Sequence, residues 1–321
     1  MTREISREAA VALAIALLWI AVALLTPGFF SPGNLRDMLI ANIPVLIAAL
    51  GMTLVILTGQ IDISIGSAFA ICGVAAGLLA KAGMPLVLVI VCSVLLGGLL
   101  GALNGALVAF VQIPSIVVTL ASMVALRDGL RWITQGAWVE DLPRDFQGFG
   151  LGLGTSQAIT VAIAIALAAL LAWGLRDLAA GRCVYATGSN ENAARLAGVS
   201  PARVTFWTFV LCGALTGCAA LLNSVRFNQI PVNAGLGLEM KVIAAVVVGG
   251  TAIRGGRGTI TGTLLGVVLL GSIGPALTFA GVSAYWEKAL QGAIILAAVS
   301  SEAWRRMPKY KLGGRLAGAR A

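Results

Sequence analysis

One short segment has residue types that differ sharply from its surroundings. Residues 58–67, with the sequence TGQIDISIGS, place two glycines, one carboxylate and two serine hydroxyls inside a long apolar region. In a membrane, irregular backbone is tolerated only where protein or water satisfies its hydrogen bonds, and an ionisable group there indicates a functional site. We therefore predict that Asp62 and Ser64 line a translocation pathway. The alternative is a turn at the membrane surface, in which Asp62 is solvated or caps the next helix.

A second segment, residues 174–203, is hydrophilic and carries the signals of a short helix. Ser189 or Asn190 can cap its start, Glu191 suits the positive end of the helix dipole, and Gly198 can end it. A helix this short is unstable alone. We expect it to dock on a partner surface at the cytoplasmic side, and the alternative is a solvated loop.

The residue types also exclude several chemistries. The chain has no histidine, and its five cysteines form no CxxC pair, so zinc-finger spacing, HExxH and histidine-based triads are excluded. No GxxxxGK[ST] sequence occurs, so we expect the chain to hold no ATP of its own, and no metal or other cofactor. Glu140-Asp141 is the single adjacent acidic pair and lies in a predicted loop, which disfavours a membrane enzyme.

Composition shows what must position these segments. Hydrophobic residues make up 59% of the 321 residues and charged residues 11%, whereas soluble domains carry about 25% charged residues. The long apolar runs predict an all-α, polytopic inner-membrane bundle of about ten transmembrane helices rather than a barrel. The predicted spans are 11–25 (an uncleaved first span), 38–58, 66–80, 85–109, 113–127, 157–174, 204–222, 239–253, 259–279 and 285–303. Three of them, 66–80, 113–127 and 239–253, are short enough to be partial helices.

The net charge of +9 comes from basic residues between the apolar runs and not from a patch interleaved with aromatic residues, so nucleic-acid binding is not expected. Ten spans with both termini in the cytoplasm place most Lys and Arg on the cytoplasmic side, including a basic tail at 304–321, as the positive-inside rule requires.

A weak internal repeat divides the single domain, 1–321, into halves at about 34–130 and 204–303. Residues 102–106 (ALNGA) resemble 289–293 (ALQGA), and Gly59 and Gly66 bracket a loop much as Gly249 and Gly256 do. Duplicated halves with interrupted helices are typical of transporters, so the repeat favours a transporter over a membrane anchor.

Four motifs in order carry a family resemblance. They are residues 59–67, close to the pattern Gly-Gly-Ile-Asp-Leu-Ser-Val-Gly-Ser, then 101–105, 188–198 and 247–259. The chain resembles the permease subunits of ribose-type ABC sugar importers, which are related more distantly to branched-chain amino-acid permeases. The resemblance runs from about residue 34 to residue 301. Gln60 departs from it, because the family usually has glycine there, and this leaves the local backbone geometry open.

The resemblance implies a coupling helix at 188–198 that docks on a cytoplasmic ABC ATPase, which binds ATP-Mg. The residues assigned to it are Asn190, Glu191, Ala194, Arg195 and Gly198. It also implies a periplasmic sugar-binding protein and pairing with a second permease, either another copy or a paralogue. We predict that movement of this helix switches a pathway lined by Asp62, Ser64, Asn104, Ser115, Thr119 and Gln291.

Other functions remain open from sequence. An ion-coupled secondary transporter would need ionisable groups within the membrane, and the acids near spans are Asp62, Glu239 and Glu287. Glu239 and Glu287 lie beside Lys241 and Lys288 in sequence, which leaves Asp62 as the one unpaired candidate. A permease for branched-chain amino acids is a further alternative, as is a single-chain channel. The sugar itself, whether pentose, hexose or an autoinducer-type furanosyl signal, is not specified by the sequence.

Overall fold

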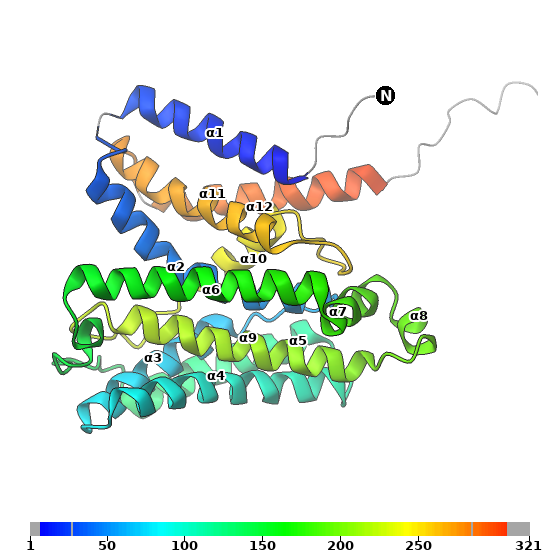
Figure 1. Cartoon of the computed structure of the whole chain (residues 1–321), viewed down its shortest axis with the longest axis horizontal. Coiled ribbons are helices and arrows are strands. Elements are labelled where there is room, and N and C mark those ends of the chain that lie inside the picture. The colour runs from blue at the N-terminus through cyan, green and yellow to red at the C-terminus, as the bar shows by residue number, and fades with distance from the viewer. Residues whose placement is uncertain (1–6, 27, 284, 307–321) are drawn as a thin grey trace, which may run out of the picture.

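The computed structural model describes residues 7–26, 28–283 and 285–306 (Figure 1). Within these residues the chain is all helical and contains no β-strand, as predicted. The helices are α1 (Arg7–Leu25), α2 (Pro32–Leu57), α3 (Ile65–Lys81), α4 (Leu86–Ala109), α5 (Ser115–Thr134), a 3-10 turn η1 (Gln147–Gly150), α6 (Leu153–Asp177), α7 (Ala179–Ser189), α8 (Glu191–Leu196), α9 (Pro201–Ser224), α10 (Leu238–Val248), α11 (Ile260–Phe279) and α12 (Tyr285–Arg306). The predicted basic tail, 304–321, begins within the last three residues of α12, and the rest of it lies outside the described residues.

Ten of these helices coincide with the ten predicted apolar spans, and α7 and α8 fall in the hydrophilic segment 174–203. In the described chain, six helices are long and apolar enough to cross a membrane: α1, α2, α4, α6, α9 and α11. Of the three spans predicted to be short, the one at 113–127 is in fact a 20-residue helix, α5. Its second half contains Arg127, Asp128 and Arg131, which ended the apolar run early.

The long helices run side by side, with α7 and α8 together at one end of the bundle (Figure 1). We call this end the α8 end. The loop 249–259 also lies there, because Gly256 and Gly258 contact α7, and the loop 58–64 lies beside it, because Gly59 contacts Arg254. The segment 135–152, which precedes α6, lies at the opposite end (Figure 1).

The centre of the bundle is the second half of α2, in which almost every side chain from Ile47 to Leu57 is buried. This half packs against α9, α11, α10 and α6. One polar contact crosses it, where the hydroxyls of Thr53 and Thr263 lie 2.7 Å apart. A helix that is apolar on all sides is expected at such a central position.

Helices α4 and α9 make the most extensive helix–helix contact in the described part of the chain. Gly97 and Gly101 on α4 face Gly213 and Gly217 on α9, and a Cβ atom added to any of the four would clash with the opposite backbone. Four-residue spacing of small residues is what lets membrane helices approach this closely. The glycines therefore set the distance between these two helices.

The predicted partial helix at 239–253 is observed as α10, which has 11 residues and ends at Val248. At about 1.5 Å per residue it covers roughly 16 Å, half the thickness of a bilayer core. The irregular segment 225–237 completes the distance by running along α3, where Ile230 packs over Gly73 and Gly77. The predicted span is therefore part helix and part irregular chain, and the irregular part is covered by α3.

Candidate functional site

The predicted pathway residues in the first half lie together around loop 58–64. The Oδ1 atom of Asp62 accepts hydrogen bonds from the Ser64 amide (2.9 Å) and the Ser64 hydroxyl (2.6 Å). Asn104 on α4 donates to the Ser64 hydroxyl (2.8 Å), and Ser122 on α5 donates to the Asn104 side-chain oxygen (2.6 Å). These four residues, which we call the Asp62 network, join the loop to two helices.

Ser115 and Thr119 hold the same loop from α5. The Ser115 hydroxyl accepts from the Ile61 amide (3.3 Å), and the Thr119 hydroxyl lies 3.4 Å from the Ile61 carbonyl oxygen. Asp62 is only 3% exposed, so it is neither solvated nor part of a surface turn. All five predicted residues are buried, and the cavity described below is not lined by them. Their role in a pathway stays a prediction, whereas their role in fixing the loop is visible.

The backbone at Gln60 settles the question raised by its departure from the family pattern. Gly59 has φ +81°, a conformation that favours glycine, whereas Gln60 is absent from the residues with positive φ. A side chain is therefore tolerated at position 60 without strain. The glycine that this turn requires is Gly59, whose α-carbon also lies against the Arg254 carbonyl.

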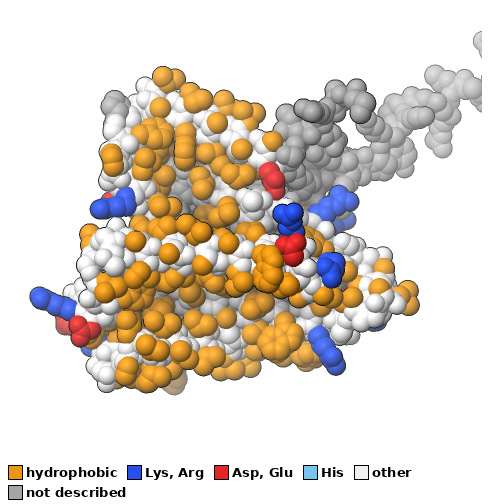
Figure 2. Space-filling model, viewed as in Figure 1, with side chains coloured by type: hydrophobic (Ala, Val, Ile, Leu, Met, Phe, Trp, Pro, Cys, Tyr) orange, Lys and Arg blue, Asp and Glu red, His pale blue; other side chains and the backbone are white. Residues whose placement is uncertain are grey.

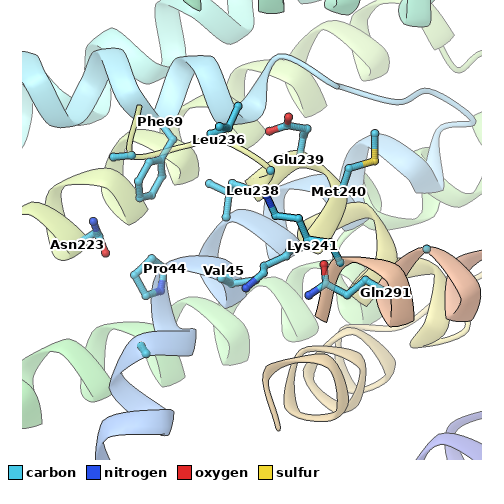
Figure 3. Close-up of a pocket in the computed structure, with 15 residues that line it drawn as sticks. Pro44, Val45, Phe69, Asn223, Leu236, Leu238, Glu239, Met240, Lys241 and Gln291 are labelled. Carbon is cyan, nitrogen blue, oxygen red and sulfur yellow. The ribbon is translucent and has the colours of Figure 1, made fainter. Parts of the chain in front are cut away.

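Gln291, the sixth predicted pathway residue, lies elsewhere and lines a cavity of about 560 Å³ between α2, α3, α10 and α12 (Figure 3). Phe69 and Pro44 contribute apolar surface to it, and Asn223 contributes an amide. The remaining lining residues are Ala41, Val45, Ala234, Leu236, Gly237, Leu238, Glu239, Met240, Lys241, Lys288 and Gly292. A mostly apolar cavity with a few polar groups is the usual form of a small-molecule site.

Two ion pairs bind α10 to its neighbours, and their pairing differs from that suggested by sequence order. Lys241 contacts Glu287 on α12 at 2.6 Å, and Glu239 contacts Arg127 on α5 at 3.4 Å. Figure 3 shows Glu239 and Gln291 on opposite sides of Lys241. The Oε2 atom of Glu239 is buried and has no hydrogen-bond partner among the described residues. This oxygen faces Gly66 of α3, where an added Cβ atom would clash with it, so the carboxylate is packed against that helix while its other oxygen pairs with Arg127.

Sequence reasoning therefore missed Glu239, Lys241, Lys288 and Asn223 as residues of one cavity. The available signal was three charged residues at or near the start of two apolar spans. Neighbours in sequence were taken as each other's partners, although residues one or two apart on a helix do not face each other. The facing helix supplied the partners instead.

The short helix predicted in the hydrophilic segment is present as α8. The Asn190 side chain caps it by accepting from the Ala193 amide (3.0 Å), and Glu191 pairs with Arg195 one turn later at 2.8 Å. Gly198 has φ +83° and follows the helix end, as a closing glycine should. These are the predicted start and end signals.

Ala194 and Leu196 of α8 face in opposite directions. Ala194 is 4% exposed, so its side chain seats α8 on the rest of the chain, whereas Leu196 is 91% exposed. A contact between α8 and a partner would therefore involve Leu196 and the ends of Glu191 and Arg195, and not Ala194.

Helix α7, which the sequence did not reveal, connects α8 to the bundle. Gly188 lies so close to the Leu57 carbonyl and the Gly256 amide that a Cβ atom would clash with both. The Gly256 amide itself donates to Leu57 (2.9 Å). Helix α7 thus sits where the two loops matched by the internal repeat, 58–64 and 249–259, touch each other.

A side-chain hydrogen bond adds to this seat. The Tyr185 hydroxyl donates to the Gly258 carbonyl at 2.8 Å. Burial raises the pKa of Tyr185 above its ordinary value, because the phenolate is less well solvated there. The hydroxyl therefore remains protonated and able to donate at physiological pH.

Comparison with known proteins gives a consistent result. The family model described as branched-chain amino acid transport system / permease component matches residues 34–299. The chain is 35% identical over 292 residues to the autoinducer 2 import system permease protein LsrC of Escherichia coli (strain K12 / DH10B), covering 91% of this chain and 85% of that protein. The LsrC proteins of Salmonella typhi and Yersinia pseudotuberculosis are each 34% identical over 291 residues, covering 91% of this chain and 84% and 83% of theirs. No solved structure matches the chain.

The family match covers the Asp62 network, the cavity and α7–α8 together, and the relatives match over nearly the same length. The chain belongs to the family of branched-chain amino acid transport system permease components.

Proposed function

We propose that this chain is the transmembrane permease subunit of an ABC importer and carries a monosaccharide or an autoinducer-type furanosyl signal. The observation that carries this proposal is the set of contacts that α7 makes through Gly188 and Tyr185, which we call the seat of α7. A solvent-exposed helix, α8, is joined through Gly188 and Tyr185 to the two loops that interrupt the bundle. An isolated channel would have no use for such a connection, whereas a transporter driven by a second protein needs one.

The same proposal includes ten crossings with both termini and α8 in the cytoplasm. Several Lys and Arg side chains gather at the α8 end, while apolar side chains cover the middle of the face (Figure 2). The segments at this end, which are the end of α6, α7, α8, the start of α9 and the loop 249–259, contain Arg176, Arg182, Arg195, Arg203, Arg254 and Arg257. Excess basic residues on one side mark it as cytoplasmic. Helices α3, α5, α10 and α12 would supply the four crossings beyond the six long apolar helices.

In this mechanism a cytoplasmic ABC ATPase binds and hydrolyses ATP-Mg, and its surface receives α8 through Leu196. Motion of α8 passes through α7 to loops 58–64 and 249–259. Loop 58–64 is fixed to α4 and α5 by the Asp62 network, and loop 249–259 follows directly on α10. Because α10 carries Glu239 and Lys241, displacement of this loop would reshape the cavity.

The substrate class follows from the cavity. Lys288 offers donors, and the side-chain amides of Asn223 and Gln291 offer both donors and acceptors. Polar groups on several sides of a partly apolar space suit a small compound with many hydroxyls. The relatives are named for import of autoinducer 2. A periplasmic sugar-binding protein would deliver the substrate, and a second permease, either a copy or a paralogue, would complete the pathway.

The family description favours a second candidate, a branched-chain amino acid. The test is uptake of labelled ribose, autoinducer 2 and leucine into cells lacking their own permeases for these compounds. The chain is co-expressed with the ABC ATPase and the binding protein that are encoded next to it in the genome. We expect uptake of the sugar or autoinducer 2 and its loss with an ATPase-dead partner. Uptake of leucine alone would contradict the sugar assignment, and gradient-driven uptake with the dead ATPase would contradict the importer.

A further inference from the structure

A groove at the α8 end is separate from the cavity and from the α7 seat. Helices α6 and α9 both pack against α2 but barely touch each other in the described chain. The space between them has a volume of about 530 Å³. Leu54 of α2 forms its floor, and Gly181 and Val184 of α7 close its end.

The walls of the groove are apolar over a considerable length. One wall is formed by α6 from Leu170 and by Leu178, which follows it, and the other by α9 from Arg203 to Leu211, about 12 Å along α9. The Thr208 hydroxyl is turned back to the Thr205 carbonyl (2.8 Å). The interior of the groove therefore offers no free polar group from Thr208 and suits a hydrocarbon chain.

The rim differs from the walls. Trp173 on α6 and Trp207 on α9 are more than half exposed, and indole rings gather where a bilayer meets water. Arg203 lies at the same end, is exposed, and has no ion-pair or hydrogen-bond partner among the described residues. Arg182 on α7 adds a second positive charge between Gly181 and Cys183, which both line the groove. Its Nη1 atom donates to the Asp177 carbonyl at 3.3 Å.

We propose that this groove binds one anionic phospholipid from the leaflet at the α8 end. An acyl chain lies between α6 and α9, and the phosphate lies beside Arg203. The positive charge of Arg203 favours an anionic lipid over a neutral one, because an unpaired arginine at a membrane surface attracts anionic headgroups. A basic pocket between spans is a known form of lipid site.

The position of the groove gives the lipid a defined neighbour. Gly181 and Val184 belong to the helix that carries Tyr185 and Gly188. An acyl chain in the groove therefore packs against Gly181 and Val184 of α7. Lipid binding requires only that the chain is embedded in a bilayer, so it does not depend on the transport proposal.

The test uses the full chain in nanodiscs of phosphatidylcholine that contain a minor fraction of phosphatidylglycerol. After release into detergent, native mass spectrometry measures which lipid stays bound. We expect about fivefold enrichment of phosphatidylglycerol, the effect of one basic side chain on binding to anionic lipid. Arg203→Gln should abolish the enrichment and Arg203→Lys should keep it. Arg144→Gln is the matched control, because it removes an exposed arginine at the opposite end.

Cys183 lines the groove and is half buried, so it reports occupancy independently. Its alkylation by a maleimide, followed by peptide mapping, should be slower in nanodiscs with phosphatidylglycerol than in pure phosphatidylcholine, and equally fast in both for Arg203→Gln. Equal retention of both lipids by the unmodified chain, or the same loss in Arg144→Gln, would overturn the proposal. Efficient cross-linking of two chains through Cys183 would also overturn it and would assign the groove to a second copy.

Discussion

Tyr185 on α7 donates its hydroxyl hydrogen to the carbonyl oxygen of Gly258, which lies 73 residues further along the chain. This bond ties the support of α8 to the loop that follows α10. Together with the close approach of Gly188 to Leu57, it makes α7 the element that contacts both interrupted regions of the bundle.

Tyr185→Phe removes this bond and leaves the ring in place. We expect a small loss in the free energy of unfolding, about 1 kcal/mol, together with a clear fall in sugar molecules transported per ATP hydrolysed. The measurement is uptake and ATP hydrolysis in the same proteoliposomes. Tyr285→Phe is the control, because Tyr285 is 91% exposed. An unchanged ratio in Tyr185→Phe would show that the bond plays no part in coupling.

Gly188→Val should be far more damaging than an ordinary helix substitution. The added atoms would meet the Leu57 carbonyl and the Gly256 amide, and backbone cannot move aside as a side chain can. We expect destabilisation of about 3 kcal/mol or displacement of α7, measured by thermal unfolding in detergent. Gly129→Ala provides the comparison, because nothing lies within 4 Å of a Cβ there. That variant should be neutral or slightly stabilising. Equal stability of the two variants would contradict the seat of α7.

Leu196→Glu tests the docking surface of α8. The side chain is 91% exposed, so the unfolding temperature should not change. Affinity for the ATPase subunit should fall roughly tenfold, equivalent to about 1.4 kcal/mol, in a pull-down titration. Leu151→Glu makes the same change at an exposed position near the start of α6, at the opposite end. If both variants bind the ATPase as the unmodified chain does, α8 is not the docking element.

Arg127→Met should destabilise the chain by about 3 kcal/mol, because it leaves the buried Glu239 carboxylate without its cation. Adding Glu239→Gln should recover most of the loss, since the uncompensated charge is then removed. Thermal unfolding of the two single variants and the double variant measures this coupling. Arg131→Met breaks an exposed pair with Asp128 and should cost less than about 1 kcal/mol. Additive losses in the double variant would show that the buried pair is not coupled.

The sequence predicted the helices well where apolar runs were long and punctuated. The ends of α8 followed from Asn190 and Gly198, whose capping chemistry is local and therefore readable. Helix α7 was missed because Gly181 and Gly188 lower helix propensity. Both glycines are required by contacts with Leu175 and Leu57, and such contacts cannot be seen before the chain is folded.

The site was predicted in part for the same reason. Asp62, Ser64 and Asn104 stood out as polar residues in apolar surroundings, and they do meet. Ser122, which donates to Asn104, did not stand out, because one serine in a helix is unremarkable in composition. The cavity depends on which helices face each other, and no periodicity in one helix specifies its neighbour. The pairing of Lys241 with Glu287 is information of that kind.

The glycine contacts between α4 and α9 have a consequence for how the bundle can move. With backbone resting on backbone at Gly97, Gly101, Gly213 and Gly217, there is no layer of side chains to change rotamer and let one helix slide past the other. The two helices must therefore tilt or shift together as one rigid body. Any rearrangement during a working cycle therefore has to be absorbed at its edges, by half-length α10 and by the turns that α7 rests upon.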